Sequence, residues 1–204
     1  MKVTHNFLSA QECATAYEYA RNTHSWYLKT FGGDCQWQFA LQDGYPTIRE
    51  FDRIKWLDPE SPFVNIARKI WTEHIGDRPY HMNRMAINGG TMGDYSVIHR
   101  DEYGPGDWYN NNRRSQKHRT FLLYLNPTWK SEWGGSTIFW QESDCDNDSP
   151  NTVWQGKHEV ERFVPETGLL LEYPSGRPHS VSPINTRELR ITFTIQISII
   201  CMIN

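Results

Sequence analysis

The strongest constraint on the fold is a series of eight short apolar or alternating segments that fills the chain from Tyr80 onward. Glycine, proline, asparagine and aspartate separate these segments, as expected for strands joined by turns and loops. The predicted strands are Met82–Asn88, Tyr95–His99, Thr120–Leu125, Ser136–Trp140, Val160–Val164, Gly168–Tyr173, Ser180–Pro183 and Arg190–Ser198. Eight strands in one compact region suit a double-stranded β-helix, which is a jelly-roll or cupin-like barrel.

The first 79 residues differ, because helical periodicity dominates there. Ser9 and Glu12 form an S-x-x-E capping box, which predicts a helix that begins at Ser9. A second helix is predicted over residues 62–74, and the aromatic-rich residues 25–57 suit short strands and loops. We therefore predict a mainly β protein with N-terminal helices. It forms one domain, residues 1–204, with a helical support region at 1–79 and a double-stranded β-helix core at 80–204.

Composition places the chain among ordinary globular proteins. It has 204 residues, 22% of them charged, and a net charge of −3, which gives no general argument for a nucleic-acid partner. The four cysteines are widely scattered without C-x-x-C spacing, so we expect reduced thiols in a cytoplasmic protein. No apolar run is long enough for a signal peptide or a membrane span, so we expect neither. The sequence leaves the oligomeric state open.

Two short pieces of the chain, eighty positions apart, combine as one predicted metal site. His99 and Asp101 lie two apart along a strand, so both side chains point to the same side. His179 follows the turn at residues 173–178 and supplies a third ligand from another strand. Two imidazoles and one carboxylate leave coordination positions open, which suits a non-haem Fe(II) centre that also binds a cosubstrate and dioxygen.

An arginine beyond His179 completes the predicted site. Arg190 leads into the apolar run 191–197, which would hold its side chain rigidly for a bidentate contact with a dicarboxylate. Thr192 points the same way and adds a hydroxyl. Arg187 is a rival, but it lies in a turn, so we favour Arg190.

Several segments resemble the Fe(II)/2-oxoglutarate-dependent oxygenases, and within them the prolyl-4-hydroxylase-like branch. The similar segments are residues 5–13, residues 119–126, the run Gly134-Gly135-Ser136-Thr137, and residues 168–175 before His179. Together they extend the resemblance over nearly the whole chain. The resemblance implies Fe(II) on the His-Asp-His group, and the C5 carboxylate of 2-oxoglutarate on Arg190 with Thr192 assisting.

The resemblance also implies a reaction. The expected activity is hydroxylation of an unactivated C–H bond, with 2-oxoglutarate and dioxygen consumed and succinate and CO2 released. A prolyl or other amino-acid or peptide substrate is the family's leading suggestion, although the fold does not fix the substrate. Ascorbate is a further candidate, as a stimulating reductant.

The chain departs from the family at one point. Residues 87–94, before the metal ligands, lack the tyrosine that relatives often carry there for the cosubstrate. Tyr124 or Tyr95 could substitute, and strand packing is the competing explanation for both. Elsewhere, His118 lies between Lys117 and Arg119 and is expected on a solvated basic edge. The remaining histidines are expected to be packed or solvated: His5, His24, His74, His81 and His158.

The substrate is the least determined feature. Two long polar loops, residues 102–117 and 142–157, have the length of lids or binding loops. The first carries Trp108, Tyr109 and several basic residues, which could dock a peptide, an anionic small molecule or single-stranded nucleic acid, or could simply be solvated.

Two other classes of function stay open. One is a zinc- or manganese-dependent isomerase or hydrolase on the same barrel, although such chemistry needs no cosubstrate arginine. The other is a non-catalytic barrel that binds sugars or peptides. Metal preference and metal-dependent stabilisation separate these classes from an oxygenase.

Overall fold

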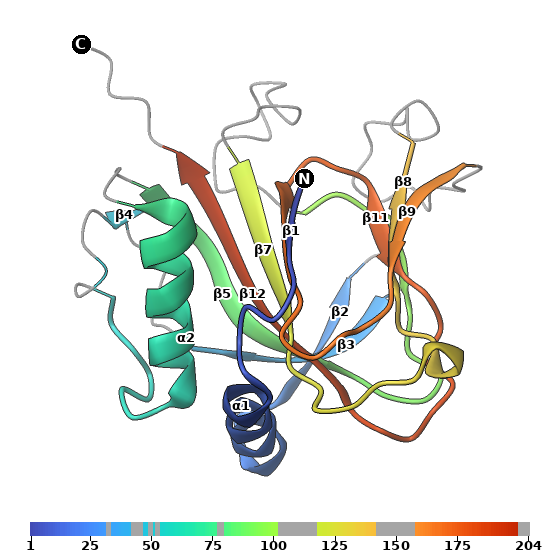
Figure 1. The fold of residues 1–204 in the computed structure, drawn as a ribbon, viewed down its shortest axis with the longest axis horizontal. Coiled ribbons are helices and arrows are strands. Elements are labelled where there is room, and N and C mark those ends of the chain that lie inside the picture. Colours follow the sequence, from blue (N-terminus) through green and yellow to red (C-terminus); the bar gives the residue numbers. More distant parts are fainter. Residues whose placement is uncertain are drawn as a thin grey trace.

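The computed structural model describes residues 1–31, 34–41, 47, 48, 51, 54–76, 80–101, 118–141 and 158–199. In this part of the chain all strand pairings are antiparallel, and they form two sheets. The larger sheet has the order β1-β10-β7-β12-β5-β3-β2, with β4 beside β5, and the smaller has the order β6-β11-β8-β9. The two sheets lie side by side in Figure 1. This architecture confirms the predicted mainly β, double-stranded β-helix fold.

The strands have the following bounds: β1 Lys2–Thr4, β2 Tyr27–Phe31, β3 Asp34–Ala40, β4 Thr47–Ile48, β5 Tyr80–Gly90, β6 Ser96–His99, β7 His118–Tyr124, β8 Thr137–Trp140, β9 Glu159–Phe163, β10 Leu170–Pro174, β11 His179–Val181 and β12 Arg190–Ile199. The eight predicted strands correspond to β5–β12, and no end differs by more than two residues. Residues 1–79 contribute β1–β4 as well as helices, and β2–β4 fall in the segment where short strands were expected. The division into support region and core stays a prediction.

Strand β12 separates the apolar core from the interior between the sheets. It pairs with β5 on one side and β7 on the other. Because side chains alternate along a strand, one face of β12 carries only apolar residues and the other carries polar ones. The apolar set is Ile191, Phe193, Ile195 and Ile197, and the polar set is Arg190, Thr192, Thr194 and Gln196. All eight are buried, so the polar face borders an enclosed polar space.

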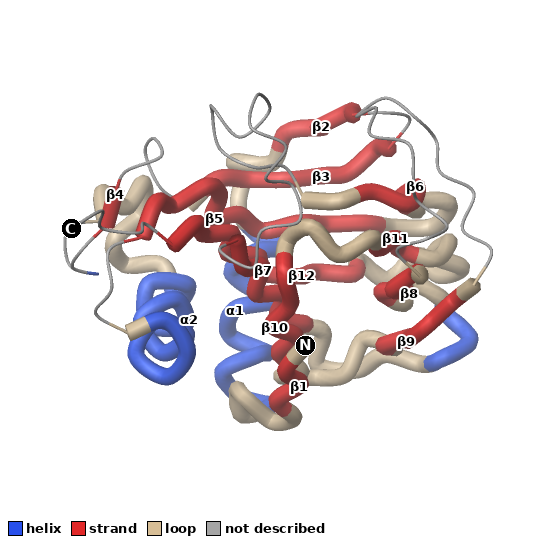
Figure 2. Tube along the Cα trace, turned by 90° about the horizontal axis from the view of Figure 1, so that it is seen from above, coloured by secondary structure: helices blue, strands red, loops and turns tan. Residues whose placement is uncertain are grey.

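The two helices cover the apolar face. Helix α1 (Ala10–Asn22) starts at the capping box that Ser9 and Glu12 form, as predicted. Helix α2 (Pro62–Ile70) ends earlier than predicted and continues as a π-helical turn, Trp71–Ile75. Both helices lie on one side of the larger sheet and the smaller sheet lies on the other (Figures 1 and 2). Phe63 of α2 packs against Phe193, with ring centroids 5.5 Å apart. None of the described helices is long and apolar enough to cross a membrane.

One histidine differs from its prediction. His118 is buried, and its Nδ1 lies 2.6 Å from the Ser198 hydroxyl. The flanking basic residues suggested a solvated edge, but the β7–β12 register puts His118 opposite Ser198 inside the sheet. The two polar loops at 102–117 and 142–157 lie outside the described residues.

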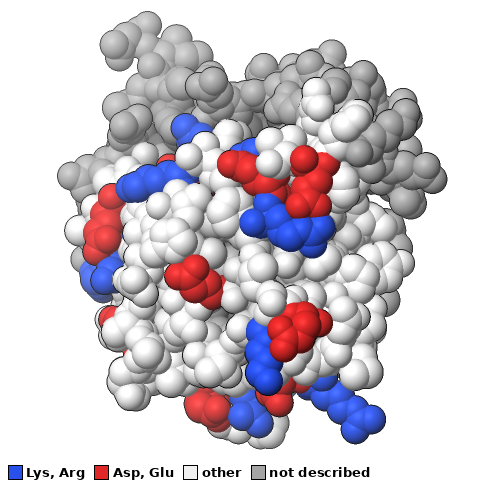
Figure 3. Space-filling model, turned by 45° about the vertical axis from the view of Figure 1, so that its right-hand side comes forward, with Lys and Arg blue, Asp and Glu red and all other residues white. Residues whose placement is uncertain are grey.

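Two ion pairs at the surface involve residues of β9. Arg162 binds Glu159 at 2.6 Å, and Arg177 binds Glu161 at 2.5 Å. On the face shown in Figure 3, basic and acidic side chains are interspersed rather than gathered by sign. Surface ion pairs of this kind contribute little to the free energy of unfolding. The charges that bear on function are therefore those inside the barrel.

Candidate metal centre and cosubstrate pocket

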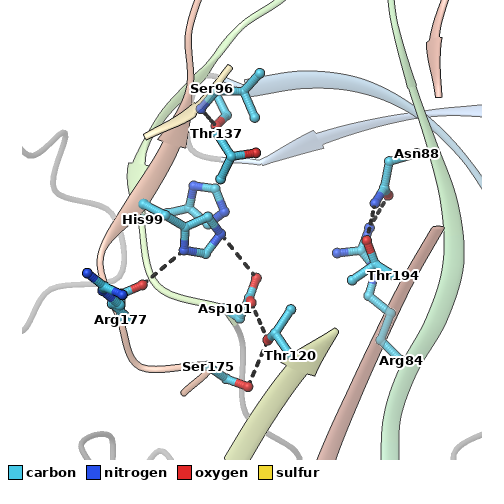
Figure 4. A network of polar contacts seen from close by, with 12 residues as sticks. Arg84, Asn88, Ser96, His99, Asp101, Thr120, Thr137, Ser175, Arg177 and Thr194 are labelled. Carbon is cyan, nitrogen blue, oxygen red and sulfur yellow. Dashed lines mark hydrogen bonds and ion pairs between the residues drawn. The ribbon is translucent and has the colours of Figure 1, made fainter. Parts of the chain in front are cut away.

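The three predicted metal ligands converge inside the barrel. His99 ends β6 and His179 begins β11, and the two residues pair directly across these strands. Asp101 follows β6, where its backbone N–H donates to the Ser175 carbonyl at 3.0 Å. One candidate ligand atom from each side chain lies within 4.8 Å of the others, so the group could hold a metal ion. Figure 4 shows His99 and Asp101 together at one wall of the interior.

Backbone contacts orient both imidazoles for metal binding. His99 Nδ1 lies 2.9 Å from the Val97 carbonyl, and His179 Nδ1 lies 2.9 Å from the Arg177 carbonyl. A carbonyl only accepts hydrogen bonds, so each Nδ1 carries the proton and each Nε2 presents a lone pair. Such a contact fixes the tautomer and ring orientation of a metal-binding histidine. Both histidines therefore contact the carbonyl of the residue two positions earlier, and this contact orients each Nε2 as a potential metal ligand.

Asp101 is held by polar residues that the sequence analysis did not assign to the site. The Thr120 hydroxyl donates to Asp101 Oδ2 at 2.5 Å, and it lies 2.8 Å from the Ser175 hydroxyl, which must then donate to Thr120. Asp101 Oδ1 faces His179 Nε2 at 3.6 Å. One carboxylate oxygen is thus fixed by Thr120, while the other points toward the imidazoles.

Burial sets the protonation of the groups around this carboxylate. It lowers the pKa of His179 to about 4, and the nearby charge of Asp101 only partly opposes this. His179 is therefore neutral near pH 7, the form that binds metals, and its contact with Asp101 is not an ion pair. Burial also raises the pKa of Tyr173 well above its usual value, and the charge of Asp101 adds to the rise. Tyr173 therefore stays protonated beside the carboxylate.

Arg190 forms the second part of the site. Its side chain is buried, with 3% of the residue exposed. Nε donates to the Gly135 carbonyl at 2.7 Å, and Nη2 lies 3.4 Å from the Thr137 hydroxyl. A Cβ atom on Gly135 would come within 2.9 Å of the arginine side chain, and Gly135 has a φ of 68°, so a glycine is required there. Arg187, the rival arginine, is exposed.

The arginine charge has no acidic partner in the described part of the chain, where no carboxylate lies within ion-pair distance of it. Burial lowers the pKa of Arg190, and contacts with Tyr124 oppose the change. The guanidinium lies 5.2 Å from the centre of the Tyr124 ring. The Tyr124 hydroxyl donates to Thr137 at 2.6 Å. A buried cation surrounded by neutral groups is costly, and an anionic ligand would compensate for it.

One cavity joins both parts of the site. Its empty space amounts to about 760 Å³, a volume that also counts space open to solvent. Five predicted site residues line it, namely His99, Asp101, His179, Arg190 and Thr192. Tyr124 lies behind Arg190 and is not a lining residue, whereas the half-exposed Tyr95 does line the cavity. Tyr173 is a further lining residue that the sequence analysis missed.

The fold and the geometry define the class of protein. It is a double-stranded β-helix whose interior carries a His-Asp-His group able to bind a metal ion and, in the same cavity, a buried arginine. Residues 80–197, more than half of the chain, match the family model described as the 2OG-Fe(II) oxygenase superfamily, and the chain belongs to that superfamily. The family implies Fe(II) and 2-oxoglutarate, and supports a dioxygenase.

Solved structures with similar folds include prolyl hydroxylases. A Pseudomonas putida prolyl-4-hydroxylase is 18% identical with a TM-score of 0.56, over 98% of this chain and 92% of that chain. A Trichoplax adhaerens prolyl hydroxylase, in complex with a hypoxia inducible factor peptide fragment, is 14% identical with a TM-score of 0.63, over 97% and 82%.

A third similar structure is HygX from Streptomyces hygroscopicus, with nickel, 2-oxoglutarate and hygromycin B bound. It is 14% identical with a TM-score of 0.61, over 96% of this chain and 81% of that chain. No curated protein sequence matches the chain. At these identities the structural likenesses establish the fold alone.

Proposed function

We propose that the protein is an Fe(II)- and 2-oxoglutarate-dependent dioxygenase that hydroxylates an unactivated C–H bond, with release of succinate and CO2. The observation that carries this proposal is the buried Arg190, which lines the same cavity as the His-Asp-His group. A metal-dependent isomerase or hydrolase needs no cation for a cosubstrate, whereas an oxygenase of this family needs one for a dicarboxylate cosubstrate.

His99, Asp101 and His179 would hold the metal. The donor set is two imidazole nitrogens and one carboxylate oxygen, which suits Fe(II) with open coordination positions. Both imidazoles present Nε2, because backbone carbonyls hold their Nδ1 protons. Thr120 and Ser175 keep the carboxylate of Asp101 oriented toward them. The residues present therefore fit the metal that the family implies.

Arg190 and Thr192 would bind the C5 carboxylate of 2-oxoglutarate, with Tyr124 supporting the arginine from behind. The spacing along β8 supports this assignment. Thr137, which contacts Arg190, lies two residues before Phe139, which pairs with His179. Two strand residues span about 7 Å. This is roughly the length of a five-carbon dicarboxylate whose other end lies at the metal.

When bound, iron and 2-oxoglutarate supply the oxidative chemistry, in which one oxygen atom of O2 enters the substrate C–H bond and the other enters succinate. The chain itself binds, orients and shelters the reactants. Burial keeps water away from the proposed contact between Arg190 and the C5 carboxylate. A hydrogen bond between charged groups is stronger in such a water-excluded site. The neutral state of His179 keeps its ligand nitrogen unprotonated at physiological pH.

The substrate that we propose is a prolyl or other amino-acid or peptide group. The likeness to two prolyl hydroxylases supports this class, and the likeness to HygX with hygromycin B bound supports a small molecule. The cavity beside the metal group, part of which is open to solvent, is a concave site of the kind that takes a small molecule or a single residue.

Anaerobic titration with Fe(II) and 2-oxoglutarate, followed by visible absorption, tests the proposal. A charge-transfer band that needs both additions is expected. Metal binding without such a band would favour an isomerase or hydrolase, and failure to bind metal would favour a non-catalytic barrel. With oxygen present, succinate formation and its response to ascorbate then measure turnover.

A further inference from the structure

Gln196 is a buried polar residue of the cavity that the proposed metal and cosubstrate contacts do not use. It lies on the polar face of β12 and lines the cavity, and only 3% of the residue is exposed. Within the part of the chain that the structure describes, its side-chain amide has no hydrogen-bond partner. Buried polar groups nearly always have a partner, so this amide is an exception that points to a ligand.

The strand register explains why the amide is left over. Gln196 pairs with Arg84 of β5 on one side and with Thr120 of β7 on the other. Both neighbours are directed elsewhere. Arg84 donates to Asn88 Oδ1 at 2.5 Å. Thr120 donates to Asp101 Oδ2 at 2.5 Å. Figure 4 shows these two contacts on opposite sides of the interior. The amide between them therefore faces the cavity rather than a protein partner.

A β-bulge lies directly beside Gln196. The register of β5 against β12 shifts after this residue, because Asn83 is an extra residue between Arg84 and Met82. Bulges bend a strand locally and re-aim its side chains, and they are over-represented next to active sites. The irregularity thus falls where β12 presents its unpartnered amide.

Gln196 lies next to the metal group and away from the proposed cosubstrate contact. Its Cα atom is about 5 Å from that of Thr120, the spacing of directly opposite residues in an antiparallel pair. The hydroxyl of Thr120 in turn holds Asp101. Thr192 lies four residues earlier on β12, about 13 Å along the strand. A ligand bound to Gln196 would therefore lie beside the metal without displacing the C5 carboxylate of 2-oxoglutarate.

The chemistry of this side chain favours an amide as the ligand. A glutamine amide has two N–H donors and one carbonyl acceptor, and another amide group satisfies both kinds of atom. A carboxylate or an ester only accepts, so either would leave the Gln196 carbonyl without a donor. The flanking residues also bring opposite charges, Arg84 directly and Asp101 through Thr120. Opposite charges on the two sides favour a neutral group over an ion at this position.

We propose that Gln196 is a substrate-specificity residue that binds a neutral amide group of the substrate, next to the C–H bond that faces the metal. This inference rests on the proposed function. It narrows the substrate class to molecules with an amide close to the reacting carbon, so a free amino acid with only a carboxylate there should be a poor substrate. A main-chain peptide group and a side-chain carboxamide share this chemistry, and the experiment separates the two.

Matched amides, esters and acids test the inference. Protein loaded anaerobically with Fe(II) and 2-oxoglutarate is titrated with L-amino-acid amides, L-prolinamide among them, and with the methyl ester and the free acid of each. The methyl esters of L-asparagine and L-glutamine, compared with the dimethyl esters of L-aspartate and L-glutamate, place the amide in the side chain instead. Binding is measured by the melting temperature and by the change in the charge-transfer band. In at least one set the amide should bind roughly ten-fold tighter or more than its matched ester or acid.

Variants then identify the residue responsible. Gln196→Met keeps the length of the side chain and removes the amide. It should weaken binding of the preferred amide by roughly 10- to 100-fold, change binding of the matched ester little, and leave the band unchanged. Gln11→Met, which removes an exposed amide of α1, is the matched control and should bind like the unaltered protein.

The melting temperature of the ligand-free protein separates a binding role from a structural one. A buried amide without a partner is costly, so Gln196→Met should melt at the same temperature as the unaltered protein or up to about 4 °C higher. A clearly lower melting temperature would mean that the amide holds the fold together, and would overturn the inference.

Three binding results would also overturn it: equal binding of amide and ester, an amide preference that survives in Gln196→Met, or no amide-specific binding in protein that forms the band. Absence of the band in the unaltered protein would overturn the proposed function itself, and this inference with it.

Discussion

Replacing Thr120 by valine removes one hydroxyl beside the metal group with little change in side-chain volume. That hydroxyl donates to Asp101 Oδ2 at 2.5 Å, and the residue is fully buried. A hydrogen bond to a charged group contributes about 1.5–3 kcal/mol. Partners of this kind typically change metal affinity by about 10- to 100-fold. We therefore expect Thr120→Val to weaken metal binding by this factor, because the Asp101 carboxylate must then be reoriented when the metal arrives.

Anaerobic calorimetric titration with Fe(II) measures the effect. Thr167→Val is the matched control, since its hydroxyl contacts only the main-chain carbonyls of Asn126 and Pro127. The control should bind the metal normally. If Thr120→Val binds as tightly as the unaltered protein while Asp101→Ala does not bind, the argument that Thr120 orients the carboxylate is refuted.

Four other predictions concern the metal group, the cosubstrate arginine, the core and a buried thiol. Asp101→Ala should abolish iron-dependent succinate formation, and turnover like that of the unaltered protein would remove Asp101 from the ligand set. Arg190→Gln should raise the KM for 2-oxoglutarate roughly ten-fold or more, whereas Arg187→Gln on the exposed turn should not; the reverse would identify Arg187 as the cosubstrate residue. Phe193→Ala should lower the free energy of unfolding, measured in urea, by about 3–5 kcal/mol. The reason is that this side chain is fully buried against Phe63, and a negligible loss would contradict that packing. Burial raises the pKa of Cys13 to about 11, so iodoacetamide should modify this thiol only after unfolding. The folded state should also lose stability between about pH 9 and about pH 11, because the thiol of the unfolded chain releases its proton at lower pH than the buried thiol does. Rapid labelling of Cys13 in the native protein, located by peptide mass spectrometry, would argue against this burial.

The sequence predicted the strands β5–β12 and five of the residues that line the cavity. Alternation predicted that Thr192 points the same way as Arg190, and the two-residue spacing of His99 and Asp101 predicted that they share a side. Thr120 and Tyr173 were missed for a different reason. Their contacts with Asp101 depend on the register between β7 and β10, which puts Thr120 opposite Tyr173. Register follows from the packed fold and not from either strand alone.

Two glycines within residues 87–94, the segment that lacks the family tyrosine, are closely surrounded by side chains. A Cβ atom on Gly89 would come within 3.0 Å of the Trp26 ring, and one on Gly90 would come within 2.9 Å of Ile184. The neighbours of both positions already occupy the space that a larger side chain would need. Tyr124 lies against Arg190, and its contact with Thr137 could not be predicted from a sequence in which the two residues lie thirteen apart.

Strand β12 shows how the fold separates stability from chemistry. Its apolar face contributes Phe193 to the core beneath the helices, while its polar face contributes Arg190 and Thr192 to the cavity. Because consecutive residues point to opposite sides, a substitution at one position leaves the environment of the other face largely intact. Phe193→Ala should therefore reduce stability with little change in the KM for 2-oxoglutarate, and Arg190→Gln should do the opposite. A buried cation costs folding free energy when no anion compensates for it. Removing the Arg190 charge should leave the ligand-free protein as stable as before or more stable, and should abolish the stabilisation that 2-oxoglutarate confers on the unaltered protein.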